Sequence, residues 1–296
     1  GIRRQFPRQG RAGEQPVSGP RLLRPDSLGE ALRLLAEPEA RCLAGGATLV
    51  AMMNAGLVES RLLVALDGIA ELRGITASPD GALRIGAMTR HRETAGEARL
   101  AGSLALIRQA AGVIANPVVR NMGTMGGSIA FADPAADYPP ALVAADAAIE
   151  IAHAGGSRRL PAREFFLDWY TTALAPGEMV TAIHLPPSKP ATSFYRKLAR
   201  TSGDFAIASV ALVREGETVR IAVGGCGPAP IRLDSAEAAL AGRLEDPRAV
   251  AEAAALLVEA SDPVDDVRGS ADYRRRLIPR LLAAALADLR ESREAA

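Results

Sequence analysis

The sequence is poor in the residues that hold metal ions. Its 296 residues include two cysteines and three histidines, and the histidines (His91, His153 and His184) lie far apart. An iron–sulfur cluster needs about four cysteine ligands, and a structural zinc site needs about four Cys or His ligands at close spacing. Any metal redox centre that works with this chain is therefore expected on another polypeptide. So few cysteines also favour a reducing compartment, which predicts a cytoplasmic location.

Several function classes lack support for similar reasons. The formal net charge is +1, which gives no electrostatic argument for binding nucleic acid or an anionic membrane. No apolar run approaches the roughly 18 residues of a membrane span. There is no G-x-S-x-G and no H-E-x-x-H motif, and we assign no catalytic acid, base or nucleophile and no metal ligand. The two common nucleotide fingerprints, G-x-G-x-x-G and G-x-x-x-x-G-K-[ST], are absent as well.

The composition that remains is globular, with 48% apolar and 23% charged residues. The length allows two or three domains. Residues 1–19, rich in Arg, Gly, Pro and Gln, are expected to form a flexible extension. The proline-rich run PPSKP (186–190) predicts a boundary between a domain over 20–188 and a domain over 191–292. We divide the first domain into two lobes, about 20–72 and 73–188.

The first lobe is predicted to be a βαβ-like unit that follows a helix capped by Asp26 or Ser27. The segment 41–44 is expected to form a short buried strand. A glycine turn and a helix that starts near Thr48 come next, and RLLVAL (61–66) is expected to form the second buried strand. Ligands often bind where a glycine turn ends the first strand of such a unit.

The rest of the chain changes from strands to helices. In the second lobe we expect hairpins that turn at 79–81 and 155–156, a helical region over 100–115 and a strand over 178–187. In the C-terminal domain we expect a hairpin that turns near 215–216 and then three amphipathic helices. The predicted bounds of these helices are 235–242, 247–260 and 273–289, and Pro279 should kink the last one or mark its first turn. Strands followed by helices indicate an α+β fold.

Two glycine loops, LAGGAT (43–48) and TMGGS (124–128), are candidates for binding an anion for the same physical reason. Backbone N–H groups approach an anion closely where no Cβ intervenes, and glycine also permits a positive φ. Thr48 adds a hydroxyl at a helix start, and Thr124 and Ser128 flank the second glycine pair. Each loop alone is also consistent with a plain tight turn. Together they could bind the two phosphates of a dinucleotide.

Several motifs in order over about residues 20–290 resemble the FAD-binding medium subunits of the molybdenum hydroxylases, the carbon monoxide dehydrogenase and xanthine dehydrogenase family. AGGAT (44–48) is similar to the family's phosphate loop, and IGAMT (85–89) is similar to its IGA-x-T segment. RNMGTMGGSIAFADPAAD (120–137) resembles the signature RN-x-[GA]-[TS]-x-GG-N with its trailing P-x-x-D. GEMVTAIHLP (177–186) and FYRKLARTSGDFAIASVA (194–211) resemble the later flavin-contact segments. Ser128 departs from the pattern, because asparagine is often found there.

The resemblance implies a two-lobed, PCMH-like FAD-binding domain followed by a C-terminal domain of antiparallel sheet plus three helices. It also implies which residues hold the FAD pyrophosphate, through the backbone of the two loops: Ala44, Gly45, Gly46, Ala47, Thr48, Thr124, Met125, Gly126, Gly127 and Ser128.

Four further residues receive roles by the same resemblance. Asp137 would accept a hydrogen bond from a sugar or ribityl hydroxyl, although capping of the next helix would also explain it. Val180 would contact the isoalloxazine or simply belong to the strand core. Lys197 would stabilise the anionic reduced flavin and raise its potential, unless it is an ordinary exposed lysine. Phe205 would stack on the ring or lie in the core.

The implied function is electron transfer. A molybdenum-cofactor large subunit oxidises the substrate, a small subunit with two-iron two-sulfur clusters relays the electrons, and the FAD of this chain passes them to an outside acceptor. The implied assembly is a heterotrimer, often paired into a dimer of heterotrimers. Two alternatives remain open from the residues: a pyridine-nucleotide dehydrogenase that uses Asp67 at the end of the second strand, and a cofactor-free assembly module that retains the fold.

Overall fold

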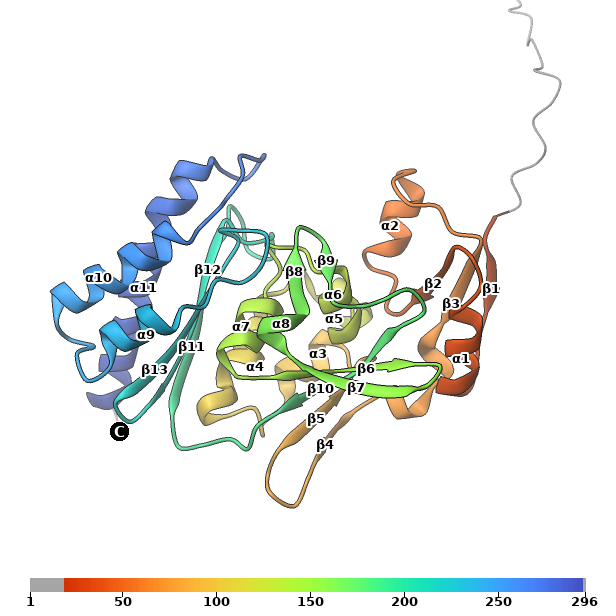
Figure 1. The fold of residues 1–296 in the computed structure, drawn as a ribbon, viewed down its shortest axis with the longest axis horizontal. Helices are drawn as coiled ribbons and strands as arrows, with labels where there is room; N and C mark the ends of the chain where they lie inside the picture. Colours follow the sequence, from red (N-terminus) through yellow and green to blue (C-terminus); the bar gives the residue numbers. More distant parts are fainter. Residues whose placement is uncertain (1–18, 295–296) are drawn as a thin grey trace, which may run out of the picture.

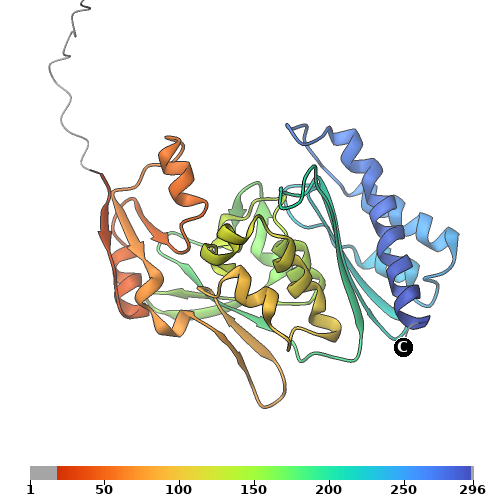
Figure 2. The same cartoon turned by 180° about the vertical axis from the view of Figure 1, so that it is seen from behind.

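The structure is a computed structural model that describes residues 19–294, without the side chains of 290–294. Three units follow one another along the long axis of the molecule, in sequence order (Figure 1). The view from behind shows the same order, with helices packed between the middle sheet and the C-terminal sheet (Figure 2). The expected extension over 1–19 falls almost entirely outside the described residues.

The N-terminal unit is a small parallel sheet with two helices. Its strands lie in the order β1-β3-β2, and both outer strands pair in parallel with β3. All four residues of β3 are buried, which makes it the centre of this unit's core. The parallel pairing confirms the predicted βαβ-like connection, but the expectation that its first strand is buried is wrong, because no residue of β2 is fully buried. Ser27 caps the first helix by accepting from the N–H of Glu30. The elements are β1 (Arg21–Leu23), α1 (Leu28–Leu35), β2 (Ala40–Leu43), α2 (Leu49–Asn54) and β3 (Leu62–Ala65).

The middle unit is built on an antiparallel sheet of five strands in the order β4-β5-β10-β6-β7. Helices α4, α6 and α7 share one buried core with β5, β6 and β10. Both expected hairpins form, β4–β5 and β6–β7. The strands are β4 (Ile75–Ala77), β5 (Leu83–Gly86), β6 (Ala148–His153), β7 (Gly156–Pro161), β8 (Phe166–Asp168), β9 (Thr171–Thr172) and β10 (Met179–Leu185). The helices are α3 (His91–Gly96), α4 (Ala105–Val113), α5 (Pro117–Met122), α6 (Met125–Phe131), α7 (Tyr138–Ala144) and α8 (Ala162–Phe165).

The C-terminal unit is an antiparallel sheet, β11-β12-β13, with three helices. Side chains alternate across this sheet, because Ala211 and Val213 of β12 join the core of the middle unit whereas Val210 and Leu212 join the core under α9–α11. The sheet is thus covered on both faces, and its inner face positions β11 against the middle unit. The elements are β11 (Thr192–Leu198), β12 (Ala208–Glu215), β13 (Thr218–Gly224), α9 (Asp234–Leu240), α10 (Pro247–Glu259) and α11 (Ala271–Glu294).

Helix α7 joins the middle and C-terminal units. All seven of its residues are buried. At its C-terminal end, Arg232 donates to the carbonyl of Val143 at 2.9 Å and Arg220 donates to the carbonyl of Ala144 at 2.9 Å. Asp137, the residue before its first turn, bonds to β11 in the way described below. Side chains of the C-terminal unit therefore hold both ends of this helix.

Pro279 lies inside α11 rather than in its first turn, so that alternative is wrong. No helix within residues 19–294 is long and apolar enough to cross a membrane. In the same range, no group of three or more His, Cys, Asp or Glu side chains is placed to hold a metal ion.

Candidate functional site

The first glycine loop lines an open hollow of about 510 Å³ at the carboxyl end of the N-terminal sheet. Strands β1, β2 and β3 all end at this edge, where ligands of parallel sheets commonly bind. Arg24 follows β1 and Asp67 follows β3, and their side chains form an ion pair at 2.5 Å. The remaining residues of the hollow come from the loop, from α2, from the end of β3 and from the end of α5: Leu43, Ala44, Gly45, Gly46, Ala47, Val50, Ala51, Asn54, Ala65 and Met122.

The amides of the first loop are available to a ligand. Gly46 has a φ of 73°, which turns the backbone between β2 and α2. Within residues 19–294, no hydrogen bond uses the N–H groups of residues 45–48. Thr48 stands at the N-cap of α2, but its hydroxyl makes no capping bond. Four consecutive amides and a hydroxyl at the rim of a hollow can bind an anion.

The two glycine loops lie directly against each other. A Cβ on Gly45 would stand 2.1 Å from the carbonyl oxygen of Met122 and 2.9 Å from the Cα of Gly123. A Cβ on Gly127 would stand 3.5 Å from the Cβ of Ala44. Glycine at position 45 is therefore required by the close approach of the second segment. The structure brings together the two loops that the sequence predicted as one site.

The second loop differs from the expectation in its secondary structure and in its amides. Gly126 and Gly127 lie in the first turn of α6, and Thr124 caps that helix by accepting from the N–H of Gly127. The N–H groups of Met125 and Gly126 donate to the carbonyls of Thr89 and Ala87, at 2.9 and 2.8 Å. These amides are thus already satisfied.

The groups that the second loop still offers to a ligand are hydroxyls. The Thr124 hydroxyl accepts a bond but keeps its own proton to donate. The Ser128 hydroxyl has no hydrogen-bond partner within the described residues 19–294, and its residue is half-buried.

A buried histidine supports the second loop from beneath. The N–H of His91 donates to the carbonyl of Gly123 at 3.1 Å, and a Cβ on Gly123 would stand 2.5 Å from the His91 Nε2. The ring also bonds through Nδ1 to the hydroxyl of Tyr138 at 3.1 Å. Burial, helped by the charge of Arg120, lowers the pKa of His91 to about 4. This neutral imidazole fixes the start of the glycine segment.

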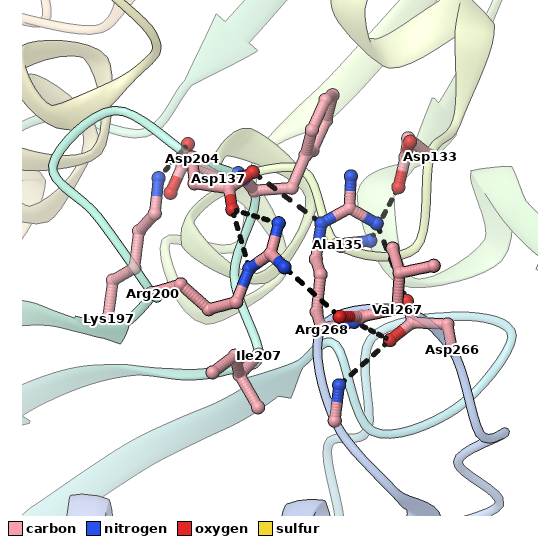
Figure 3. A network of polar contacts seen from close by, with 12 residues as sticks. Asp133, Ala135, Asp137, Lys197, Arg200, Asp204, Ile207, Asp266, Val267 and Arg268 are labelled. Atoms are coloured by element: carbon pink, nitrogen blue, oxygen red, sulfur yellow. Dashed lines mark hydrogen bonds and ion pairs between the residues drawn. The ribbon is translucent and has the colours of Figure 1, made fainter.

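Asp137 and Lys197, which were assigned separately, form a buried ion pair (Figure 3). Their side chains are 5% and 7% exposed, and the Nζ of Lys197 lies 3.0 Å from one carboxylate oxygen. The other oxygen accepts from the hydroxyl of Tyr195 at 2.7 Å. Burial raises the pKa of Asp137, and the charge of Lys197 and the Tyr195 bond oppose that rise. Lys197 is therefore not an exposed lysine, and the Asp137 side chain makes no capping bond to α7.

The last two predicted residues lie in different environments. Val180 is 5% exposed and belongs to the core of the middle unit, beside an irregularity in the pairing of β10 with β6. Phe205 is 39% exposed, and the guanidinium of Arg268 lies 5.1 Å from its ring centre. Arg268 sits in a network with Asp133, Asp204 and Asp266 that surrounds the loop before β12 (Figure 3). The ring of Phe205 is thus not part of the core.

Sequence reasoning missed several residues of the site. Arg24 and Met122 line the hollow, and Tyr195 completes the buried network. A signal existed for Tyr195, because it precedes Lys197 by two residues and β-strand side chains repeat on one face with that period. Met122 lies inside the quoted segment 120–137, but no sequence signal placed its side chain at the first loop.

Comparison with known families gives two matches along the chain. Residues 16–188 match the FAD binding domain in molybdopterin dehydrogenase, and residues 193–289 match the CO dehydrogenase flavoprotein C-terminal domain. Among curated relatives, the carbon monoxide dehydrogenase medium chain of Hydrogenophaga pseudoflava is 35% identical over 270 residues, which cover 88% of this chain and 94% of the relative. The alpha subunit of the 6-hydroxypseudooxynicotine dehydrogenase complex from Paenarthrobacter nicotinovorans is 35% identical over 283 residues, 91% of this chain and 95% of the relative.

Solved structures show the same relation. The fold matches a chain of carbon monoxide dehydrogenase from Hydrogenophaga pseudoflava with a TM-score of 0.87 and 35% identity, covering 91% of this chain and 96% of that one. It matches a chain of quinoline 2-oxidoreductase from Pseudomonas putida 86 with a TM-score of 0.85 and 30% identity, over the same shares.

Proposed function

The chain belongs to the family of FAD-binding medium subunits of the molybdenum hydroxylases, and on this premise we propose that its two glycine loops and the buried Asp137–Lys197 pair hold FAD. The chain is an oxidoreductase subunit with FAD as its cofactor. Its function is electron transfer, and the bound FAD supplies the chemistry of accepting electrons and passing them on. The following assignments concern what the residues of this chain do toward FAD.

The contact between the two loops is the observation that carries the proposal. The loop whose amides at 45–48 are free packs against residues 122, 123 and 127 of the segment that also carries the hydroxyls of Thr124 and Ser128. Free amides from one loop and hydroxyls from the neighbouring loop would suit the two phosphates of a dinucleotide. The amides would come from the first loop and the hydroxyls from the second, with Ser128 donating where relatives often carry asparagine.

The two halves of FAD would extend from this point in opposite directions. The adenosine half would lie in the hollow, where the Arg24–Asp67 pair offers a cation and an acceptor for ribose hydroxyls. The flavin half would extend toward the junction with the C-terminal unit. There Asp137 would accept from a ribityl hydroxyl, Lys197 and Val180 would lie at the ring, and Phe205 offers an exposed aromatic face.

The partners follow the same premise. Relatives of this chain are medium chains or subunits of larger complexes. We assign it a molybdenum-cofactor large subunit and a small subunit with two-iron two-sulfur clusters, assembled as a dimer of heterotrimers in the cytoplasm. The two free cysteines of the chain, Cys42 and Cys226, are compatible with a reducing compartment.

The experiment is reconstitution of the chain with FAD in the presence of its partner subunits. We expect one FAD per chain, seen as flavin absorbance that remains with the protein through gel filtration. Gly46→Val and Gly127→Val should abolish this retention while the C-terminal unit stays folded. A complex that stays colourless after reconstitution would refute the assignment in favour of a cofactor-free module, and preferential binding of NADH would favour the pyridine-nucleotide alternative.

A further inference from the structure

We infer that Asp137 is a positioning residue that fixes Lys197 and compensates its charge, so that the two residues tune the reduction potential of the bound FAD in opposite directions. This inference rests on the proposed function, because it takes the flavin half to lie near Lys197. It goes beyond that function by assigning a role to the pair as a whole and to Tyr195, which holds the carboxylate from the other side.

The pair is built to act as one electrostatic unit. Its two side chains are 5% and 7% exposed, so solvent and salt screen their charges only weakly. In such a place each charge acts strongly on its surroundings, and the two together cancel to a large extent. A neighbouring group whose charge changes on reduction would therefore sense the balance between the carboxylate and the ammonium.

The donors and acceptors of the network also define what remains for a ligand. Lys197 has three N–H donors, and the Asp137 carboxylate and the carbonyl of Val113 take two of them, at 3.0 and 3.3 Å. Each carboxylate oxygen of Asp137 takes one donor, and a carboxylate has room for about four. One donor on Lys197 and further acceptor positions on Asp137 thus remain, and neither residue has to give up its partner to contact FAD.

The same strand supplies a matched control on its opposite face. Arg196, between Tyr195 and Lys197 in sequence, forms an ion pair with Asp288 of α11. The Arg196 side chain is 49% exposed and points away from the middle unit. Asp288→Asn therefore removes the carboxylate partner of a cation on β11 without changing the charge at the Asp137 side of the sheet.

The test measures the reduction potential of FAD in the assembled complex by spectroscopic titration. Asp137→Asn keeps the shape of the side chain but leaves Lys197 uncompensated, so reduction should become at least tenfold more favourable. This corresponds to a rise of about 30 mV for a two-electron couple. Lys197→Met should lower the potential by a similar amount. The double variant Asp137→Asn/Lys197→Met should return to within about threefold of the parent, and Asp288→Asn should leave the potential unchanged.

Three results would overturn the inference: equal potentials in all variants, shifts of the same sign in both single variants, or loss of FAD from Asp137→Asn. The last result counts because the amide oxygen of asparagine still accepts the hydrogen bond proposed from the ribityl hydroxyl, so a variant that removes only the charge should keep FAD. Absence of FAD from the parent complex would instead refute the proposed function. The two failures are therefore distinguishable.

Discussion

Gly45→Ala tests whether the contact between the two glycine loops holds the cofactor. The new Cβ would stand 2.1 Å from the Met122 carbonyl oxygen, and a separation below 3.0 Å is essentially never found for a real Cβ. The obstructing atoms belong to the backbone, so a side-chain rotation cannot relieve the clash. The two loops must separate by nearly 1 Å, which is about twice the tolerance of roughly 0.5 Å for a preorganised site.

The size of the effect follows from this displacement. Overpacking of this kind costs about 1–3 kcal/mol, which we expect as a loss in the free energy of unfolding. The affinity for FAD should fall by tenfold or more, which corresponds to about 1.4 kcal/mol, because the first loop is displaced from the second segment. Gly46→Ala acts by a different route, since its φ of 73° strains any other residue whereas the nearest side chain is 3.3 Å away.

The assay is titration of the chain with FAD, together with thermal unfolding of each variant. Gly112→Ala is the matched control, because this glycine lies in α4 and an added Cβ meets nothing within 4 Å. We expect it to bind FAD like the parent and to be slightly more stable, since glycine destabilises a helix by about 0.5–1 kcal/mol relative to alanine. A Gly45→Ala protein that binds FAD with the parent dissociation constant would refute the reasoning that loop contact builds the site.

Three further predictions concern charges. Arg24→Ala leaves Asp67 unpaired in the hollow and should weaken FAD binding about tenfold, roughly 1.4 kcal/mol. Because salt screens exposed charges, the loss of affinity should be smaller at high salt, which a titration with FAD at two ionic strengths would measure. Arg232→Ala removes buried donors to the end of α7 and should lower the free energy of unfolding, measured by urea denaturation, by about 2–3 kcal/mol. Arg163 forms an exposed ion pair, so Arg163→Ala should lower the free energy of unfolding by less than about 1 kcal/mol. Because burial lowers the pKa of His91 from 6.5 to about 4, the unfolded chain takes up the proton first. Roughly 3 kcal/mol of stability should therefore be lost as the pH falls from 6.5 toward 4, and His91→Gln should flatten this dependence in unfolding experiments across that range.

Local patterns predicted the elements that depend on neighbours in sequence. The glycine turn after β2, the hairpin at 155–156 and the long hairpin β12–β13 all follow from short-range alternation and turn chemistry. Strand β1 was missed, because its three residues carry little pattern and its partner β3 comes about forty residues later. Strand β11 was treated as a contact segment and not as a strand, although its pairing with β12 places the Asp137 partners.

The site shows the same division between local and distant information. The glycines at 126 and 127 were assigned to an anion loop, whereas the structure places them in a helix turn against Ala87 and Thr124. A glycine pair by itself cannot tell whether a ligand or another backbone approaches it. Likewise, sequence singled out Asp137 and Lys197 one at a time, and only the fold shows that each neutralises the other.

The pairing of Asp137 with Lys197 makes the C-terminal unit a contributor to the proposed site. It supplies Tyr195 and Lys197 to one end of α7, and Arg220 and Arg232 to the other end. A chain that ended before β11 would leave Asp137 without either partner and would expose a helix whose seven residues are all buried. An unpaired buried carboxylate costs several kcal/mol or takes up a proton, and in either case the acceptor expected for the ribityl chain is altered. The proposed flavin end of the site is therefore a joint product of the middle and C-terminal units, whereas the proposed pyrophosphate end, the two glycine loops, belongs to the first two units alone.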